Sequence, residues 1–131
     1  MRVFWSVAFG AALGGLSRYY FAGFIQQRAG ADFPAGTLIV NITGSFLLGF
    51  IMRYALQSDI ISPETRVLLT SGFCGGYTTF STFSYETALM LGDGEYKRAA
   101  LYVGGSFVFA LAATLLGFAA AQRLLMLRQA V

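Results

Sequence analysis

Four long apolar stretches follow one another along the chain and leave only short polar breaks between them. A helix needs about 20 apolar residues to cross the hydrocarbon core of a bilayer, and each stretch reaches roughly that length. The stretches cover residues 3–26, 35–54, 64–91 and 99–122. Little chain remains outside them, so residues 1–131 are expected to form a single transmembrane domain. We therefore predict an all-α integral membrane protein with four transmembrane helices.

The composition supports a membrane protein. Charged residues make up 11% of the chain, against about 25% in ordinary soluble proteins, and the mean hydropathy is +0.65. The apolar run after Met1 and Arg2 continues beyond the roughly 7–15 residues of a signal-peptide core. We therefore expect the N-terminal segment to be a retained first helix.

Charge and cysteine content exclude two classes of function. The net charge is +3, but the nine basic residues are scattered singly and form no stripe that would bind nucleic acid. The chain has no His and a single cysteine, Cys74, so it lacks an intrachain disulfide and the usual acid–base or nucleophile pairs. We expect neither nucleic-acid binding nor enzymatic catalysis.

The third stretch contains a combination that an ordinary membrane helix avoids. Gly75 and Gly76 precede Thr78 and Thr79, which weakens helical continuity near the middle of the span. Non-helical backbone survives at membrane depth only where protein or a water-filled cavity satisfies it. Carbonyls freed at a break from Gly75 to Thr78 would suit a hard cation, which prefers oxygen ligands. A glycine-rich packing face is the alternative interpretation.

Hydroxyl and aromatic residues follow this break. Phe80 and Phe83 are three residues apart and so share a helix face, with Ser81 and Thr82 between them. Neutral O–H donors can replace the hydration shell of a small anion without trapping it, and ring edges carry the positive part of the aromatic quadrupole. The pattern permits an anion path, although packing or lipid contact also explains two phenylalanines.

Polar residues inside the first two spans allow two interpretations each. Arg18 follows fifteen uncharged residues, and it either reaches the membrane surface or attracts anions to a vestibule. Asn41 lies within the second span, where its amide must be hydrogen-bonded, so it either joins helices or serves a pore. Gly10 and Gly14 have the spacing of a close helix–helix contact.

The positions of the basic residues permit two orientations in the membrane. If the loops alternate sides, five basic residues face three or four on the other side. The first set is Arg2, Arg53, Arg66, Arg123 and Arg128, and the second is Arg28, Lys97, Arg98 and possibly Arg18. Orientation follows Lys/Arg asymmetry in short loops. The weak bias makes an antiparallel homodimer possible.

Two separated motifs resemble the signature of the Fluc fluoride channels, also called the CrcB family. Residues 41–49 read NITGSFLLG, and residues 75–84 read GGYTTFSTFS. The resemblance extends over essentially the whole chain, with a Gly-Gly-x-x-Arg pattern at 14–18 and an aromatic-rich fourth span. It implies a dual-topology, antiparallel homodimer in the inner membrane, with two pores that export fluoride passively and relieve its toxicity.

The resemblance also implies roles for individual residues. The fluoride pore is expected to be formed by Asn41, Phe80, Ser81, Thr82, Phe83, Tyr102 and Ser106. Arg18 and Glu86 are placed near the vestibules. Backbone carbonyls of the break from Gly75 to Thr78, from both subunits, are expected to hold a structural sodium ion.

Two other classes of protein remain open on the residues alone. A small proton-coupled multidrug exporter also has four helices and often inserts in both orientations, but it needs a membrane-embedded carboxylate. The first span has none. A structural membrane protein would use the Thr, Ser and Phe run only to pack helices.

Overall fold

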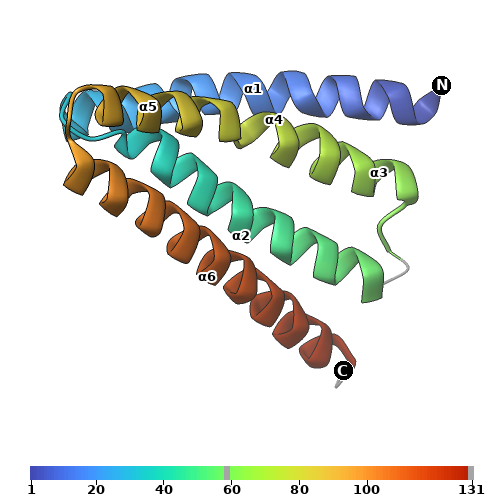
Figure 1. Ribbon diagram of the computed structural model, residues 1–131. Helices are drawn as coiled ribbons and strands as arrows, with labels where there is room; N and C mark the ends of the chain where they lie inside the picture. The colour runs from blue at the N-terminus through green and yellow to red at the C-terminus, as the bar shows by residue number, and fades with distance from the viewer. Residues whose placement is uncertain (58–59, 130–131) are drawn as a thin grey trace.

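The computed structural model describes residues 1–57 and 60–129, which fold into helices with no strand among them (Figure 1). The elements are α1 (Arg2–Ala29), α2 (Ala35–Gln57), α3 (Pro63–Val67), the π-helical turn η1 (Leu68–Cys74), α4 (Gly75–Tyr77), α5 (Phe80–Gly92) and α6 (Tyr96–Gln129). Residues 58, 59, 130 and 131 of the predicted 1–131 domain lie outside the described residues. The all-helical class is confirmed.

The helices extend beyond the expected apolar stretches. The helix expected over 99–122 runs from Tyr96 to Gln129, and the helix expected over 3–26 runs from Arg2 to Ala29. Good helix formers such as Arg, Gln, Leu and Met continue a helix after its apolar stretch has ended. Hydropathy therefore locates these helices but underestimates their length.

The third stretch starts at a well-defined cap and runs without interruption through α3, η1 and α4. The Ser62 hydroxyl accepts a hydrogen bond of 3.2 Å from the amide of Thr65, and Pro63 occupies the first helical turn. A serine cap followed by proline is a strong helix start, because both suit the unsatisfied N–H groups there. The backbone then stays helical as far as Tyr77.

Helical structure stops at Thr78 and Thr79, which have extended backbone angles, and resumes at Phe80. The irregular backbone thus lies further along the chain than the expected range from Gly75 to Thr78. Gly75 and Gly76 are helical. A Cβ on Gly76 would lie 2.6 Å from the carbonyl oxygen of Ala11 in α1, so this glycine permits a close helix contact.

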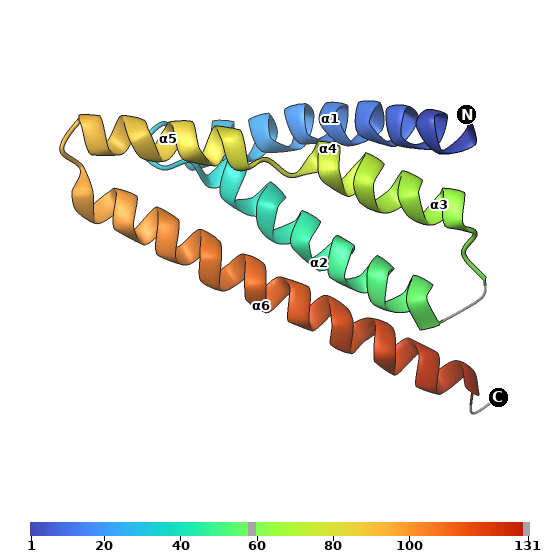
Figure 2. The ribbon, with the colours of Figure 1, turned by 45° about the vertical axis from the view of Figure 1, so that its right-hand side comes forward.

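Small residues set the other helix contacts too. A Cβ on Gly10 would lie 2.9 Å from the Cα of Gly72, so the expected close packing of the first helix is confirmed. Between α2 and α6, a Cβ on Gly117 would lie 2.8 Å from the amide nitrogen of Phe50. In both views α2 lies between α1 and α6, and the two termini are at the same end of the bundle (Figures 1 and 2).

Large apolar side chains cover much of the surface, and the interior is small. Tyr102, Val40 and Cys74 are the largest fully buried side chains. By length and composition, two of the described helices, α2 and α6, are apolar enough to cross a membrane. The expectation that the other two stretches also cross it stays a prediction.

We expect Gly14→Ala to destabilise the bundle and Gly15→Ala to leave it intact. A Cβ at Gly14 would lie 2.8 Å from the amide nitrogen of Tyr77, whereas one at Gly15 would meet nothing within 4 Å. Overpacking lowers the free energy of unfolding by about 1–3 kcal/mol, while an open Gly→Ala change in a helix is neutral or stabilises by up to about 1 kcal/mol. Unfolding of the two variants in detergent measures both; equal effects would contradict this packing.

Candidate functional site

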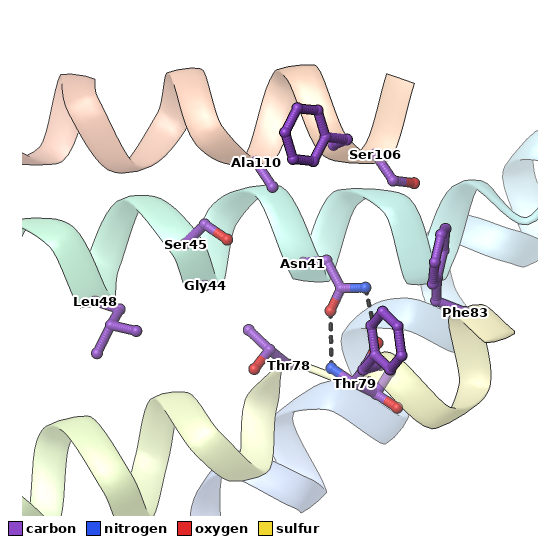
Figure 3. A pocket seen from close by; sticks show the side chains of 11 residues that line it. Asn41, Gly44, Ser45, Leu48, Thr78, Thr79, Phe83, Ser106 and Ala110 are labelled. Atoms are coloured by element: carbon purple, nitrogen blue, oxygen red, sulfur yellow. Dashed lines mark hydrogen bonds between the residues drawn. The ribbon is translucent and has the colours of Figure 1, made fainter. Parts of the chain in front are cut away.

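The side-chain amide of Asn41 pairs with the backbone of Thr79. The Nδ2 of Asn41 donates to the carbonyl oxygen of Thr79 at 2.9 Å, and the amide of Thr79 donates to the Oδ1 of Asn41 at 2.8 Å. Figure 3 shows both bonds as dashed lines. Thr79 is 9% exposed, and buried backbone groups without partners are costly. Asn41 therefore joins α2 to the interruption of the third stretch.

The same amide lines a pocket of about 290 Å³ between α2, the Thr78–Thr79 segment, α5 and α6. The lining contains no charged residue; it consists of Asn41, Gly44, Ser45, Leu48, Thr78, Thr79, Phe80, Phe83, Ser106, Phe107 and Ala110. Of the seven residues expected at a pore, four line the pocket, namely Asn41, Phe80, Phe83 and Ser106, and a fifth, Tyr102, contacts the ring of Phe83. The pocket brings residues of three helices together.

Ser106 brings a hydroxyl to the lining of this pocket. Its Oγ is buried and has no hydrogen-bond partner among residues 1–57 and 60–129. A buried hydroxyl without a partner loses solvation, so it favours any acceptor that enters the pocket. Ser106 thus lines the pocket while its hydroxyl points into the protein, and a rotation of the side chain would offer this donor to a bound anion.

The two phenylalanine rings lie at one side of the pocket. The ring centroids of Phe80 and Phe83 are 5.6 Å apart, with planes tilted by 43°. Phe80 is 78% exposed, whereas Phe83 packs inward, with its centroid 5.1 Å from the ring of Tyr102. Phe83 therefore connects the lining of this pocket to Tyr102, which in turn bonds to the next polar group.

That group is the carboxylate of Glu86. The hydroxyl of Thr37 donates to its Oε1 at 2.7 Å, and the hydroxyl of Tyr102 donates to its Oε2 at 2.6 Å. Thr37 was not expected at the site. It precedes Asn41 by four residues, so the two lie on one face of α2. This spacing could have identified Thr37 from the sequence as a neighbour of the site.

Glu86 also lines a second pocket, of about 360 Å³, near the ends of α1 and α5. Its charged lining groups are Asp32, Glu86, Asp93, Glu95 and Arg98. Arg98 and Glu95 form an ion pair at 2.5 Å. The two pockets therefore differ in character, because the first is neutral and the second carries several carboxylates.

Ser81 and Thr82 lie in the first turn of α5. Neither lines the first pocket. Their hydroxyls lie 3.3 and 3.0 Å from the Oγ1 of Thr79, which also accepts a hydrogen bond from the amide of Thr82. They belong to the cap of α5. Arg18 lines neither of the two pockets.

The interruption changes the bonding around the carbonyls of Gly75 and Thr78. In a continuous helix each carbonyl accepts from the amide four residues later. Here the amide of Thr79 bonds to Asn41 instead of Gly75, and the amide of Thr82 bonds to the Oγ1 of Thr79 instead of Thr78. Both carbonyls thereby lose the donor that a regular helix would give them.

Comparisons with known proteins give consistent results. The family model described as CrcB-like protein, Camphor Resistance (CrcB), matches residues 5–118. The chain is 49% identical over 119 residues to the "Fluoride-specific ion channel FluC" of Geobacter metallireducens, covering 91% of this chain and 96% of the relative. It is 53% identical over 111 residues to the protein of the same name from Geotalea daltonii, covering 85% and 90%.

We expect Asn41→Val to loosen the interruption. The change leaves the N–H and C=O of Thr79 without their side-chain partner, which costs about 1–3 kcal/mol for each buried group. Amide hydrogen exchange at Thr79 should accelerate, and the unfolding midpoint should fall. Ser45→Ala, which removes a polar group from the same helix and pocket but no bond to Thr79, serves as the control; equal exchange rates in the two variants would contradict the prediction.

Proposed function

The chain belongs to the CrcB-like family, and from this premise we propose that it is a channel that conducts fluoride passively out of the cell. The observation that carries the proposal is the 49% identity to a fluoride-specific ion channel over 96% of that relative. A channel of this kind is a transporter and not an enzyme. We further propose a multi-pass protein of the inner membrane, whose activity relieves fluoride toxicity.

The neutral pocket is the proposed place where fluoride loses water. Asn41 and Ser106 line it and carry neutral donors: the second N–H of the Asn41 amide, and the Ser106 hydroxyl once its side chain rotates. Such donors replace hydration without the tight binding that a full positive charge would cause. The tilted rings of Phe80 and Phe83 add positive edges at one side.

We propose that the route continues past Phe83 toward Tyr102 and Glu86. The ring contact of Phe83 with Tyr102, and the bond of Tyr102 to Glu86, support this continuity. The second pocket beside Glu86 is then a vestibule, and Arg18 is proposed to act at a vestibule as well. Ser81 and Thr82 would contribute to the path through the hydroxyl cluster around Thr79.

An antiparallel homodimer is the proposed assembly. Phe80 and Tyr85 are 78% and 65% exposed, so α5 presents aromatic side chains outward next to the interruption. A second copy in the opposite orientation would cover this face within the bilayer. We propose that the interruption lies at mid-membrane and that the carbonyls of Gly75 and Thr78 from both copies hold a sodium ion, since both lose their regular helical donors.

The alternative of a proton-coupled multidrug exporter is not supported. The two relatives described above are named fluoride-specific ion channels, and α1 contains no carboxylate. The carboxylate of Glu86 already accepts bonds from Thr37 and Tyr102.

The proposal predicts fluoride efflux from liposomes that contain the purified protein. A fluoride electrode measures efflux, and a chloride electrode measures the same vesicles loaded with chloride. We expect rapid fluoride release with little chloride release, because the relatives named above are fluoride-specific channels. Absence of fluoride flux from a folded protein would refute the function.

In the same assay, Phe80→Ile and Asn41→Asp should slow fluoride flux while the dimer persists. Losing a ring edge is expected to cost up to about tenfold. A carboxylate in the path repels fluoride by several kcal/mol at short range, so a loss of about 100-fold or more is expected. Phe9→Ile and Gln27→Glu make the same chemical changes on α1 and should have no effect; unaltered flux in both pore variants would remove these side chains from the path.

Sodium should support channel function if the carbonyl site exists. After prolonged dialysis against a large organic cation, we expect slower fluoride flux or a weaker dimer, because the uncompensated carbonyls then repel one another. Returning sodium should restore both. Flux and dimerisation that do not depend on sodium would contradict this site without affecting the fluoride assignment.

A further inference from the structure

Arg53, near the C-terminal end of α2, has no carboxylate partner among residues 1–57 and 60–129. The Nη2 of Arg53 donates to the Oε1 of Gln122 at 3.4 Å. Its Nε is buried and has no hydrogen-bond partner within the described part of the chain. The described part of the chain contains one ion pair, between Arg98 in the first turn of α6 and Glu95 just before it, and Arg53 takes no part in it. A partly buried cation with a free N–H favours an anion beside it.

Two further arginines come from the end of α6. Arg128 lies in the last turn and donates to the hydroxyl of Tyr54, the residue after Arg53. Arg123 follows Gln122 in the sequence and is exposed. We call Arg53, Arg123 and Arg128 the arginine corner. Cations are favoured at helix C-terminal ends. Hydrogen bonds between α2 and α6 hold Arg53 and Arg128 in place.

The arginine corner lies at the level expected for lipid headgroups. On α2, 18 uncharged residues precede Arg53, counted from Ala35, and on α6, 24 uncharged residues run from Ala99 to Gln122. At about 1.5 Å per residue these segments measure about 27 and 36 Å, close to the roughly 30 Å hydrocarbon core. The first charges after both segments therefore meet the phosphate layer.

The surroundings favour a lipid over a free anion. Leu56, Leu124 and Leu127 are 64%, 41% and 61% exposed next to the corner, and they can contact acyl chains while the arginines contact phosphate. The opposite end of the bundle is different: Arg98 is paired with Glu95, and the guanidinium of Arg28 lies 3.5 Å above the ring of Phe24. We propose that the arginine corner is a binding site for the headgroup of an anionic phospholipid.

The test compares lipid binding by the full chain in a neutral detergent, without fluoride. Native mass spectrometry titrates phosphatidylglycerol and, separately, phosphatidylcholine against the wild type and R53Q/R128Q. Each basic residue near a phosphate contributes about fivefold in affinity, so the double variant should bind phosphatidylglycerol about 25-fold more weakly. Phosphatidylcholine binding should change little. R28Q, which removes one positive charge at the other end, should bind as the wild type does.

Three results would overturn the proposal. Unchanged phosphatidylglycerol binding by R53Q/R128Q would show that the arginine corner does not bind this lipid. An equal loss of affinity in R28Q would show that binding follows the net charge of the protein and not a particular site. Displacement of the lipid by an equal concentration of inorganic phosphate would identify a free-anion site instead. Should the double variant unfold, R53K keeps the charge but loses the planar fork, and it should bind severalfold more weakly; wild-type affinity in R53K would contradict the site. Fluoride flux enters none of these readouts.

Discussion

Two hydrogen bonds between the Asn41 amide and the backbone of Thr79 make the interruption of the third stretch possible. An extended residue surrounded by apolar helices leaves an N–H and a C=O that water cannot reach, and each costs free energy unless it is bonded. Asn41 satisfies both from α2. Because the backbone is extended at Thr79, its hydroxyl can cap α5, and the position of that cap fixes where Phe80 and Phe83 lie.

Helix α2 organises the rest of the site through a short series of polar and small residues. Thr37 holds Glu86, Asn41 holds Thr79, and the hydroxyl of Thr43 lies 3.0 Å from that of Tyr77, just before the interruption. A Cβ on Gly44 would lie 3.0 Å from the ring of Tyr77. One rigid helix thus positions both sides of the interruption and the carboxylate beyond it, so the pocket keeps its shape without a charged lining residue.

The sequence was sufficient for the helical class and for four of the eleven residues that line the first pocket, but less so for details that depend on contacts between helices. Gly75 and Gly76 suggested the start of a break, yet both are helical, and Gly76 instead permits the close approach of α1; the sequence cannot show that neighbour. Thr37 looked like an ordinary helix residue, and its partner Glu86 is 49 positions away. Ser81 and Thr82 were expected in a pore by resemblance, and the sequence alone did not reveal that their hydroxyls also cluster with that of Thr79 at the start of α5.

The contrast in charge between the two pockets bears on how the proposed route would select its ion. The first pocket has no charged lining residue, so attraction by net charge cannot concentrate anions there, and the second contains several carboxylates that repel them. An anion can enter only if short-range donors compensate for lost water. Both oxygens of Glu86 accept hydrogen bonds, from Thr37 and Tyr102, and these donors offset part of the negative charge that would repel an anion. Selection then depends on the fit of donors to a small ion, a property of neutral side chains held rigidly by α2.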